Sequence, residues 1–365
     1  MKPKNTNNPE FKKGRGAQTN PPNAFLIQQY SSEESYLNYC YAEEESATSN
    51  TTRYITVHPK SIINKIDSPD IPFQWSINPY QGCEHGCSYC YARTTHEYWG
   101  YSAGTDFEQT ILVKEKAAFL LRETFAKKSW QPELIVLSGN TDCYQPAEQT
   151  FKITRQLLEV FLECRNPVGI ITKNSLILRD LDLLQELHRL QLIGITLSIT
   201  TLDDTLRRAM EPRTSSVKNR LKALEVLSKI GIPVNVNMAP IIPGLNSHEI
   251  FDLVQRVADL GASSVSYIMA RLNGPIAPIF ENWLQNSYPD RSEKVLNLIR
   301  ETHGGALTDS RFKVRMKGEG QYAAQIAESF RVAKLKSGLG DTTKSIKLNT
   351  TLFERPGKGG QLGLF

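Results

Sequence analysis

From residue 76 onward, short apolar runs alternate with longer amphipathic segments, and this alternation constrains the fold more than any other feature of the sequence. Short runs rich in Val and Ile are typical of buried parallel strands. Parallel neighbours need a crossover connection, so strands that alternate with helices predict successive βα units. We expect strands at 76–80, 134–138, 168–172, 192–198, 233–238 and 264–269. We expect helices at 113–127, 147–164, 178–189, 214–230 and 247–259.

Two α/β architectures suit such a series of units: an open doubly wound sheet, and a complete or partial barrel. No Gly-x-Gly-x-x-Gly motif follows a predicted strand, which weakens the dinucleotide-binding version of the open sheet. In a barrel, the chemistry gathers at the carboxyl ends of the strands. Polar residues that directly follow the predicted strands are therefore the candidates for a functional site.

Composition divides the chain into four parts. Residues 1–70 are rich in Asn, Pro, Gly and charged residues, and we expect an irregular, mobile leader with short ordered pieces around 53–63. Residues 71–275 would form the βα core and residues 276–340 a helical C-terminal extension. Residues 341–365 would form a flexible tail.

The composition also excludes some classes of protein. With 40% hydrophobic and 22% charged residues in a chain of 365, a sizeable core can be buried. The sequence has no apolar run of about 18 residues, and its N-terminus lacks the apolar stretch of a secretory signal. We therefore expect a cytoplasmic protein with no membrane contact. From residue 311 to the end, eleven Lys or Arg oppose four Asp or Glu, and a basic extension permits a polyanionic partner.

Three of the six cysteines lie directly after the first predicted strand, in the spacing C-x3-C-x2-C: Cys83, Cys87 and Cys90. Clustered thiolates hold iron–sulfur clusters, zinc or Cu(I). Three thiolates on a four-iron cubane leave one iron open for substrate or cofactor. The alternative is a structural zinc, for which His85 would complete a Cys3His set.

The cysteine spacing, with an aromatic residue before the last cysteine, resembles the signature of the radical S-adenosylmethionine (radical SAM) superfamily. The longer strings Asn78-Pro-Tyr-Gln-Gly-Cys83 and Cys90-Tyr-Ala-Arg93 resemble its branch related to spore photoproduct lyase, over residues 76 to 330. The resemblance implies a partial (βα)6 barrel whose three cysteines ligate a [4Fe-4S] cluster. It also implies that SAM binds the fourth iron and is cleaved to a 5′-deoxyadenosyl radical, which abstracts a hydrogen atom.

The same resemblance implies roles for other residues. Tyr89 matches the aromatic residue that the superfamily places near the SAM adenine, and Tyr91 is a second candidate. The segment after the second strand replaces the usual Gly-Gly-Glu wording with other small and polar residues, which we expect to contact SAM: Ser138, Gly139, Asn140 and Asp142. Lys173 and Ser198, at the ends of the next two strands, resemble residues directed at the SAM carboxylate and ribose.

Cys143 follows Asp142 at the same face of the predicted barrel. In spore photoproduct lyase, a cysteine beyond the second strand donates a hydrogen atom to the product radical, and the resemblance implies this catalytic role for Cys143. The alternative is a small buried apolar residue, as most free cysteines are.

The last five residues, Gln361-Leu-Gly-Leu-Phe365, resemble the motif by which bacterial DNA repair proteins dock on the sliding clamp. A flavodoxin or ferredoxin is the implied electron donor. The leading hypothesis is a radical SAM enzyme that acts on damaged or modified nucleic acid. A second hypothesis keeps the chemistry and changes the substrate to a protein or a small metabolite. A third is a zinc-stabilised nucleic-acid-binding module without catalysis.

Overall fold

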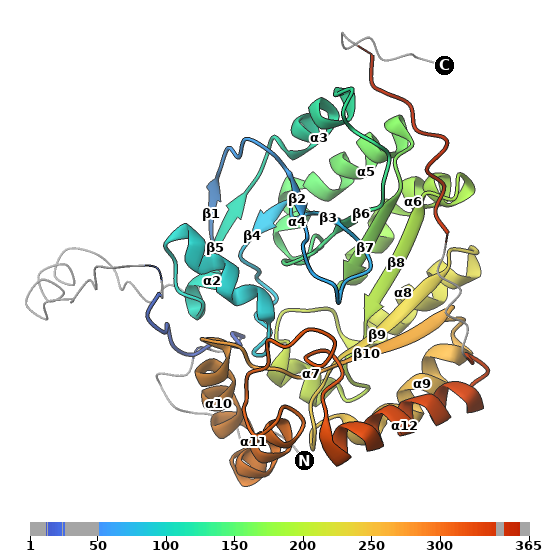
Figure 1. Cartoon of the computed structure of the whole chain (residues 1–365). Helices are drawn as coiled ribbons and strands as arrows, with labels where there is room; N and C mark the ends of the chain where they lie inside the picture. The colour runs from blue at the N-terminus through green and yellow to red at the C-terminus, as the bar shows by residue number, and fades with distance from the viewer. Residues whose placement is uncertain (1–11, 13, 24, 26–50, 341–346, 358–365) are drawn as a thin grey trace, which may run out of the picture.

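The computed structural model describes residues 12, 14–23, 25, 51–340 and 347–357. Its larger sheet has seven strands in the order β10-β9-β8-β7-β6-β3-β2, as Figure 1 shows. All neighbours are parallel except β2, which runs antiparallel to β3. The bounds are β2 (Ile63–Lys65), β3 (Trp75–Ile77), β6 (Ile135–Leu137), β7 (Val168–Thr172), β8 (Ile193–Ser198), β9 (Val234–Ile241) and β10 (Ser264–Met269).

The order of the parallel strands follows the chain without reversal, which distinguishes this sheet from a doubly wound one. Among the described residues, β10 and β3 do not pair, so the barrel stays open. The predicted partial barrel is therefore confirmed. Two of the predicted strands, 168–172 and 264–269, coincide with β7 and β10.

The predicted strand at 76–80 is wrong, because Pro79 lies within it and has no backbone N–H to donate. The chain leaves the large sheet after β3 and enters a second sheet, of order β1-β5-β4, at β4. This sheet contains β1 (Arg53–Thr56), β4 (Tyr80–Gln81) and β5 (Thr110–Val113). The predicted helix at 113–127 is consequently shorter, since the buried run before it is strand β5.

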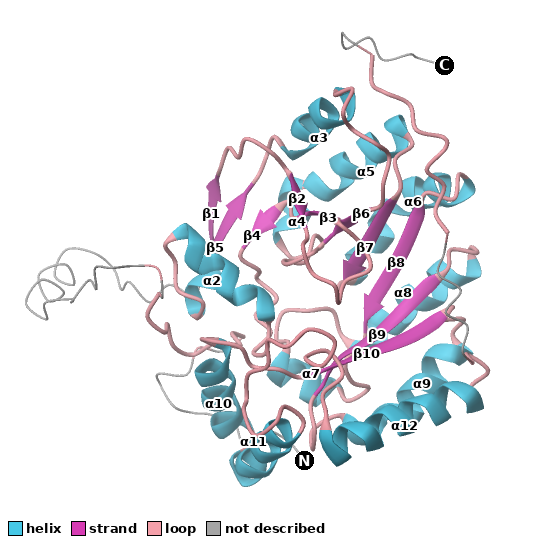
Figure 2. Ribbon diagram, in the orientation of Figure 1, coloured by secondary structure: helices cyan, strands magenta, loops and turns pink. Residues whose placement is uncertain are grey.

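Helices follow the strands and lie along the outside of the curved sheet (Figure 2). The predicted helix at 147–164 is interrupted at Lys152, whose φ is 52°. The helices that accompany the barrel are α3 (Ala117–Ala126), α4 (Ala147–Phe151), α5 (Ile153–Cys164), η2 (Ser175–Asp180), α6 (Leu181–Arg189), α7 (Asp204–Met210), α8 (Val217–Lys229), η3 (Ser247–Glu249) and α9 (Ile250–Asp259). The remainder are η1 (Tyr91–Trp99), α2 (Thr105–Gln109), α10 (Ile276–Ser287), η4 (Pro289–Arg291), α11 (Ser292–Glu301) and α12 (Gly320–Lys336). None of the helices described is long and apolar enough to cross a membrane.

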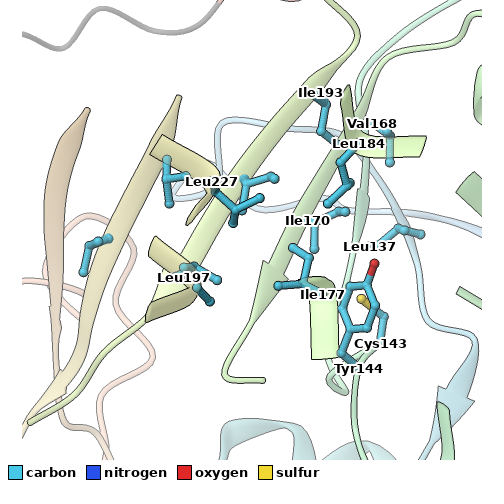
Figure 3. Close-up of a cluster of buried hydrophobic side chains, with 14 of the residues drawn as sticks. Leu137, Cys143, Tyr144, Val168, Ile170, Ile177, Leu184, Ile193, Leu197 and Leu227 are labelled. Atoms are coloured by element: carbon cyan, nitrogen blue, oxygen red, sulfur yellow. The ribbon is translucent and has the colours of Figure 1, made fainter. Parts of the chain in front are cut away.

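The main core lies between the parallel strands and the helices that cover them (Figure 3). Strand side chains such as Ile170 and Leu197 meet helix side chains such as Leu184 and Leu227 there. Burial of this apolar surface fixes the helices against the strands. The arrows of β8 to β10 point toward α7, as Figure 2 shows.

The C-terminal part of the chain is built into the fold on two sides. Helix α12 lies against α9, and its Phe330 ring is 4.6 Å from the ring of Tyr267 on β10. Residues 347–357 then cross the amino ends of the strands (Figure 1). The Glu354 N–H donates to the Cys164 carbonyl at 2.9 Å, and Phe353 packs against Phe125.

The prediction of a flexible tail over 341–365 is therefore wrong for residues 347–357, because backbone hydrogen bonds and an aromatic contact hold these residues against the core. The predicted docking motif, Gln361–Phe365, lies outside the described residues. Part of the predicted leader is also ordered: Arg15 and Ala17 are buried, and Ala17 donates its N–H to Glu108 at 2.7 Å.

Candidate active site

The three clustered cysteines lie on one loop between β4 and η1, and Cys87 of this loop packs in one buried cluster with Met210, Ile242 and Ala270, which follow β8, β9 and β10. Cys83 and Cys87 are buried, Cys90 is half-buried, and all three thiols are free. Gly86 allows the tight turn between them, since its φ is 66° and a Cβ there would lie 2.7 Å from the Glu108 carboxylate. The sequence therefore brings three thiols together without a disulfide.

A buried ion pair supports the loop from behind. The Arg93 guanidinium lies 2.5 Å from the Glu108 carboxylate, and both side chains are fully buried. Arg93 also donates to the Cys87 carbonyl at 2.9 Å. The backbone N–H groups of Gly16 and Ala17 complete the contacts of Glu108. The N-terminal segment thus helps to fix the cysteine loop.

The donor set fits a cluster held by three thiolates. Burial raises the pKa of Cys83, Cys87 and Cys90, so the ligand-free thiols are protonated and binding of a metal must displace their protons. In the described part of the chain, no three His, Cys, Asp or Glu side chains gather closely enough to hold one metal ion.

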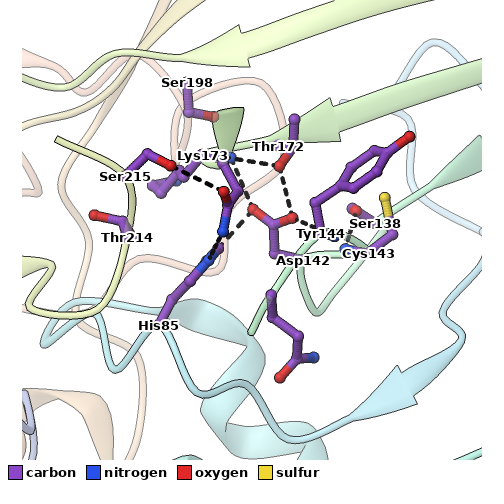
Figure 4. A network of polar contacts seen from close by, with 12 residues as sticks. His85, Ser138, Asp142, Cys143, Tyr144, Thr172, Lys173, Ser198, Thr214 and Ser215 are labelled. Atoms are coloured by element: carbon purple, nitrogen blue, oxygen red, sulfur yellow. Dashed lines mark hydrogen bonds and ion pairs between the residues drawn. The ribbon is translucent and has the colours of Figure 1, made fainter. Parts of the chain in front are cut away.

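His85 does not complete a Cys3His set, because both of its ring nitrogens face other groups. Nδ1 lies 3.4 Å from an Asp142 oxygen, and Nε2 lies 3.2 Å from the Asn174 amide nitrogen. Figure 4 shows this imidazole directed toward Asp142. A loop that offers three thiols and no fourth ligand leaves one iron of a cubane open.

Asp142 ties the cysteine loop to the strands (Figure 4). Its carboxylate accepts hydrogen bonds from the Thr172 hydroxyl and the Lys173 N–H, both at 2.7 Å, and from the Tyr144 N–H at 2.9 Å. Because the Asp142 carboxylate also faces His85, protein groups contact it on two sides. This placement favours a positioning role over the direct SAM contact that the sequence predicts.

A buried polar cluster holds Tyr89. The Tyr89 hydroxyl donates to Glu211, whose other oxygen lies 2.5 Å from the Arg220 guanidinium. Arg220 also donates to the Ser198 carbonyl at 3.1 Å, so the end of β8 belongs to the same cluster. Burial alone would raise the pKa of Glu211, but Arg220 and Lys173 outweigh it and lower that pKa. Glu211 is therefore a buried carboxylate at the site.

Sequence reasoning did not identify Glu211 or Arg220, since no local motif marks them. They follow β8, and only the fold brings them to Tyr89 on the cysteine loop. A polar residue that directly follows a predicted strand is a candidate for the site. Glu211 does not meet this criterion, because helix α7 separates it from β8.

Lys173 occupies the position that the sequence predicts. Its ammonium lies 6.0 Å from the centroid of the Tyr89 ring, beside the cysteine loop. Within the described residues, this ammonium makes no hydrogen bond or ion pair. A half-buried ammonium in that position is available to pair with the carboxylate of a ligand.

The backbone of the segment after β6 contacts residues on either side of the cysteine loop, namely Tyr91 and Asn78. The Tyr91 hydroxyl donates to the Gly139 carbonyl at 2.6 Å, and the Asn140 N–H donates to the Asn78 side chain at 2.8 Å. Ser138 has a φ of 72°, which turns the chain at the end of the strand. The structure thus brings Tyr91, Ser138, Gly139 and Asn140 together.

Cys143 is not brought to this group. It is fully buried and packs in the main core beside Leu137 and Tyr144 (Figure 3). Figure 4 shows its sulfur directed away from Lys173 and His85. The catalytic relay stays a prediction, and the placement favours the alternative of a small buried apolar residue.

Comparison with known proteins agrees with this geometry. The model of the radical SAM superfamily matches residues 77–257. An uncharacterized protein of Mycobacterium tuberculosis is 33% identical over 252 residues, which span 67% of this chain and 74% of that protein. An uncharacterized protein of Methanocaldococcus jannaschii is 29% identical over 67% of this chain and 86% of its own length. The chain belongs to the radical SAM superfamily and is an enzyme of that class.

Among solved structures, spore photoproduct lyase complexed with dinucleoside spore photoproduct has a similar fold. The two share 17% identity with a TM-score of 0.58, over 78% of this chain and 79% of that one. A radical SAM Nalpha-GlyT isomerase of Pseudomonas phage M6 is 25% identical over 62% of this chain and 46% of its own length. The fold therefore agrees with the predicted branch of the superfamily.

Proposed function

We propose that this radical SAM enzyme holds a [4Fe-4S] cluster through Cys83, Cys87 and Cys90 and acts on nucleic acid. The observation that carries the cofactor part is the loop of three free thiols at the carboxyl ends of the parallel strands, where His85 faces Asp142 and Asn174. When bound, the cluster and SAM supply the electron and the 5′-deoxyadenosyl group for hydrogen-atom abstraction. The chain supplies the ligands, the orientation and the exclusion of water.

Lys173 is the residue that we assign to the SAM carboxylate. Its ammonium lies beside the Tyr89 ring, and Glu211 holds that ring by its hydroxyl group. Asp142 accepts a hydrogen bond from the Lys173 N–H, and this bond fixes the backbone from which the Lys173 side chain extends. The aromatic ring offers an apolar surface for the adenine.

Three observations support a nucleic-acid substrate. The loop of residues 311–317, which we call the basic loop, carries four Lys or Arg residues and lies beside β10, since the Met269 N–H donates to the Met316 carbonyl at 3.0 Å. It also exposes an aromatic side chain, Phe312, on which a base could stack. A protein of similar fold binds a dinucleoside photoproduct. A protein or small metabolite remains the alternative substrate.

The proposal also covers the electron donor, the location in the cell and a protein partner. A flavodoxin or ferredoxin would deliver the electron in the cytoplasm. The C-terminal Gln361–Phe365 would dock on a sliding clamp, with Leu and Phe in an apolar pocket. A synthetic peptide of this sequence tests that contact by calorimetry, and no binding at high peptide concentration would reject it.

Single Cys→Ala variants test the cofactor assignment. Replacing Cys83, Cys87 or Cys90 should remove most of the iron that the wild type retains after anaerobic reconstitution. Cys164→Ala is the matched control, since Cys164 is a free buried cysteine on α5, and it should keep the wild-type iron content. Retention of iron by all three variants would reject the assignment.

Salt dependence tests the class of substrate. A labelled single-stranded DNA oligonucleotide should bind the holoprotein with an affinity that falls steeply as salt rises, because phosphate contacts release counterions. Binding that is absent at low salt would reject a nucleic-acid substrate and favour a protein or metabolite.

A further inference from the structure

Arg271 is the second residue after Met269, the last residue of β10, so the fold places it at the edge of the barrel where the candidate site lies. Its Nη1 atom is shielded from solvent and has no hydrogen-bond partner. Among the side-chain atoms of the described residues that are buried without a partner, this is the only one that belongs to an arginine guanidinium, which is positively charged. A buried polar group without a partner is costly, and a charged one more so.

The carboxylates near Arg271 already form ion pairs with other cationic side chains. Asp70 lies 2.5 Å from the Arg315 guanidinium, and Asp309 lies 2.9 Å from Arg311 and 3.3 Å from His303. In the part of the chain that the structure describes, no acidic side chain forms an ion pair with Arg271. Burial and the neighbouring Arg315 consequently lower the pKa of Arg271. An anion from outside the chain would relieve both effects.

The surroundings of Arg271 connect it to the site and to the basic loop. Ala270 and Leu272, the chain neighbours of Arg271, belong to the buried cluster that contains Cys87 and Tyr89 of the cysteine loop. The basic loop lies beside the end of β10, since the Met269 N–H donates to the Met316 carbonyl at 3.0 Å, and its Arg315 stacks 4.5 Å from the centroid of the exposed Phe312 ring. Arg271 therefore lies between the cysteine loop and the surface to which we assign the nucleic acid.

We propose that Arg271 binds a phosphate group of the substrate and so positions it beside the cysteine loop. This inference rests on the proposed function, because it takes the substrate to be a nucleic acid. The other source of an anion at this site is the SAM carboxylate, which we assign to Lys173. A guanidinium suits the phosphate, since its fork of N–H donors matches two phosphate oxygens.

Binding of a fluorescein-labelled single-stranded DNA oligonucleotide to the holoprotein, followed by anisotropy over a range of salt concentrations, tests the proposal. Arg271→Gln should weaken binding about tenfold and reduce the slope of log affinity against log salt by about 0.7, the effect of one lost phosphate contact on a single strand. Arg271→Lys keeps the charge and should keep most of the slope. Arg189→Gln on α6, an exposed arginine paired with Glu186, is the matched control and should change neither quantity.

Two further measurements on the same variants separate the alternatives. SAM binding, measured by equilibrium dialysis, should be unchanged in Arg271→Gln, and a loss there would assign Arg271 to the SAM carboxylate instead. The melting temperature of Arg271→Gln should equal or exceed that of the wild type, because the substitution removes a half-buried cation whose Nη1 atom has no partner. A marked fall in melting temperature would reveal a structural partner and overturn the proposal.

The outcomes also separate this inference from the proposed function. If the wild type binds the oligonucleotide and Arg271→Gln keeps the full salt slope, only the role of Arg271 is rejected. If the wild type does not bind the oligonucleotide at low salt, the nucleic-acid substrate is rejected and the inference falls with it.

Discussion

The Glu108 carboxylate lies 2.5 Å from the Arg93 guanidinium, and both side chains are fully buried behind the cysteine loop. Arg93 contacts the Cys87 carbonyl, and Glu108 binds the N-terminal segment through Gly16 and Ala17. One ion pair thus links the cysteine loop and α2 to the N-terminal segment, which lies about 90 residues away in the sequence.

Glu108→Gln should destabilise the protein by about 3–5 kcal/mol, because it leaves the buried charge of Arg93 without its counter-ion. Iron retention should fall with stability, since the cysteine loop loses its support. Chemical unfolding of the apoprotein and iron analysis of the reconstituted protein measure the two effects. Glu163→Gln, which breaks the exposed ion pair with Arg122, is the control and should cost at most about 1 kcal/mol. Equal effects of the two substitutions would contradict the account.

Lys114 gives a prediction about pH. Its ammonium donates to the Asn78 carbonyl at 2.8 Å, and burial lowers the pKa of Lys114 to about 8. Between that value and the pKa of about 10.4 in the unfolded chain, the unfolded state binds more protons, so stability rises with pH across this window. The difference in unfolding free energy between wild type and Lys114→Met should change accordingly from pH 8 to pH 10. A difference that is constant with pH would show that Lys114 titrates normally.

Cys143→Ala tests the predicted relay. Because Cys143 packs in the core, the substitution should lower stability by about 1 kcal/mol and leave the iron content and the release of 5′-deoxyadenosine unchanged. Once a substrate is known, a changed ratio of products in this variant would support the relay against the core placement.

Phe353→Ala tests the C-terminal segment that crosses the amino ends of the strands. Phe353 lies 5.7 Å from the Phe125 ring and is half-buried, so its removal should cost about 2 kcal/mol, less than the roughly 3–5 kcal/mol of a fully buried Phe. Phe119→Ala on α3 is the matched control, since that ring is exposed. Thermal unfolding that does not distinguish the two variants would show that the segment adds no stability.

The sequence predicts the elements whose signals are local. The runs at 168–172 and 264–269 are Val- and Ile-containing strands in their entirety, and the spacing of the three cysteines is itself a motif. The strand at 76–80 is mispredicted because apolar content does not reveal the change of sheet at Pro79. Within the predicted tail, the contacts of residues 347–357 are missed because their partners, such as Cys164, lie far away in the sequence.

The polar part of the site depends on tertiary contacts that no single sequence reveals. Glu211 meets Tyr89 across more than a hundred residues, and Asp70 meets Arg315 across more than two hundred. No sequence motif marks Arg271, and only the structure shows that its Nη1 atom lacks a hydrogen-bond partner among the described residues. Local chemistry therefore predicts the cluster ligands, whereas the fold decides what surrounds them.

The release of 5′-deoxyadenosine tests the central claim most directly. The protein is purified and reconstituted without oxygen, and SAM and dithionite are then added. A brown protein with about four irons per chain that converts SAM to 5′-deoxyadenosine, and loses this activity in Cys83→Ala, is the result that the account predicts. A colourless protein that holds one zinc and leaves SAM intact would contradict it.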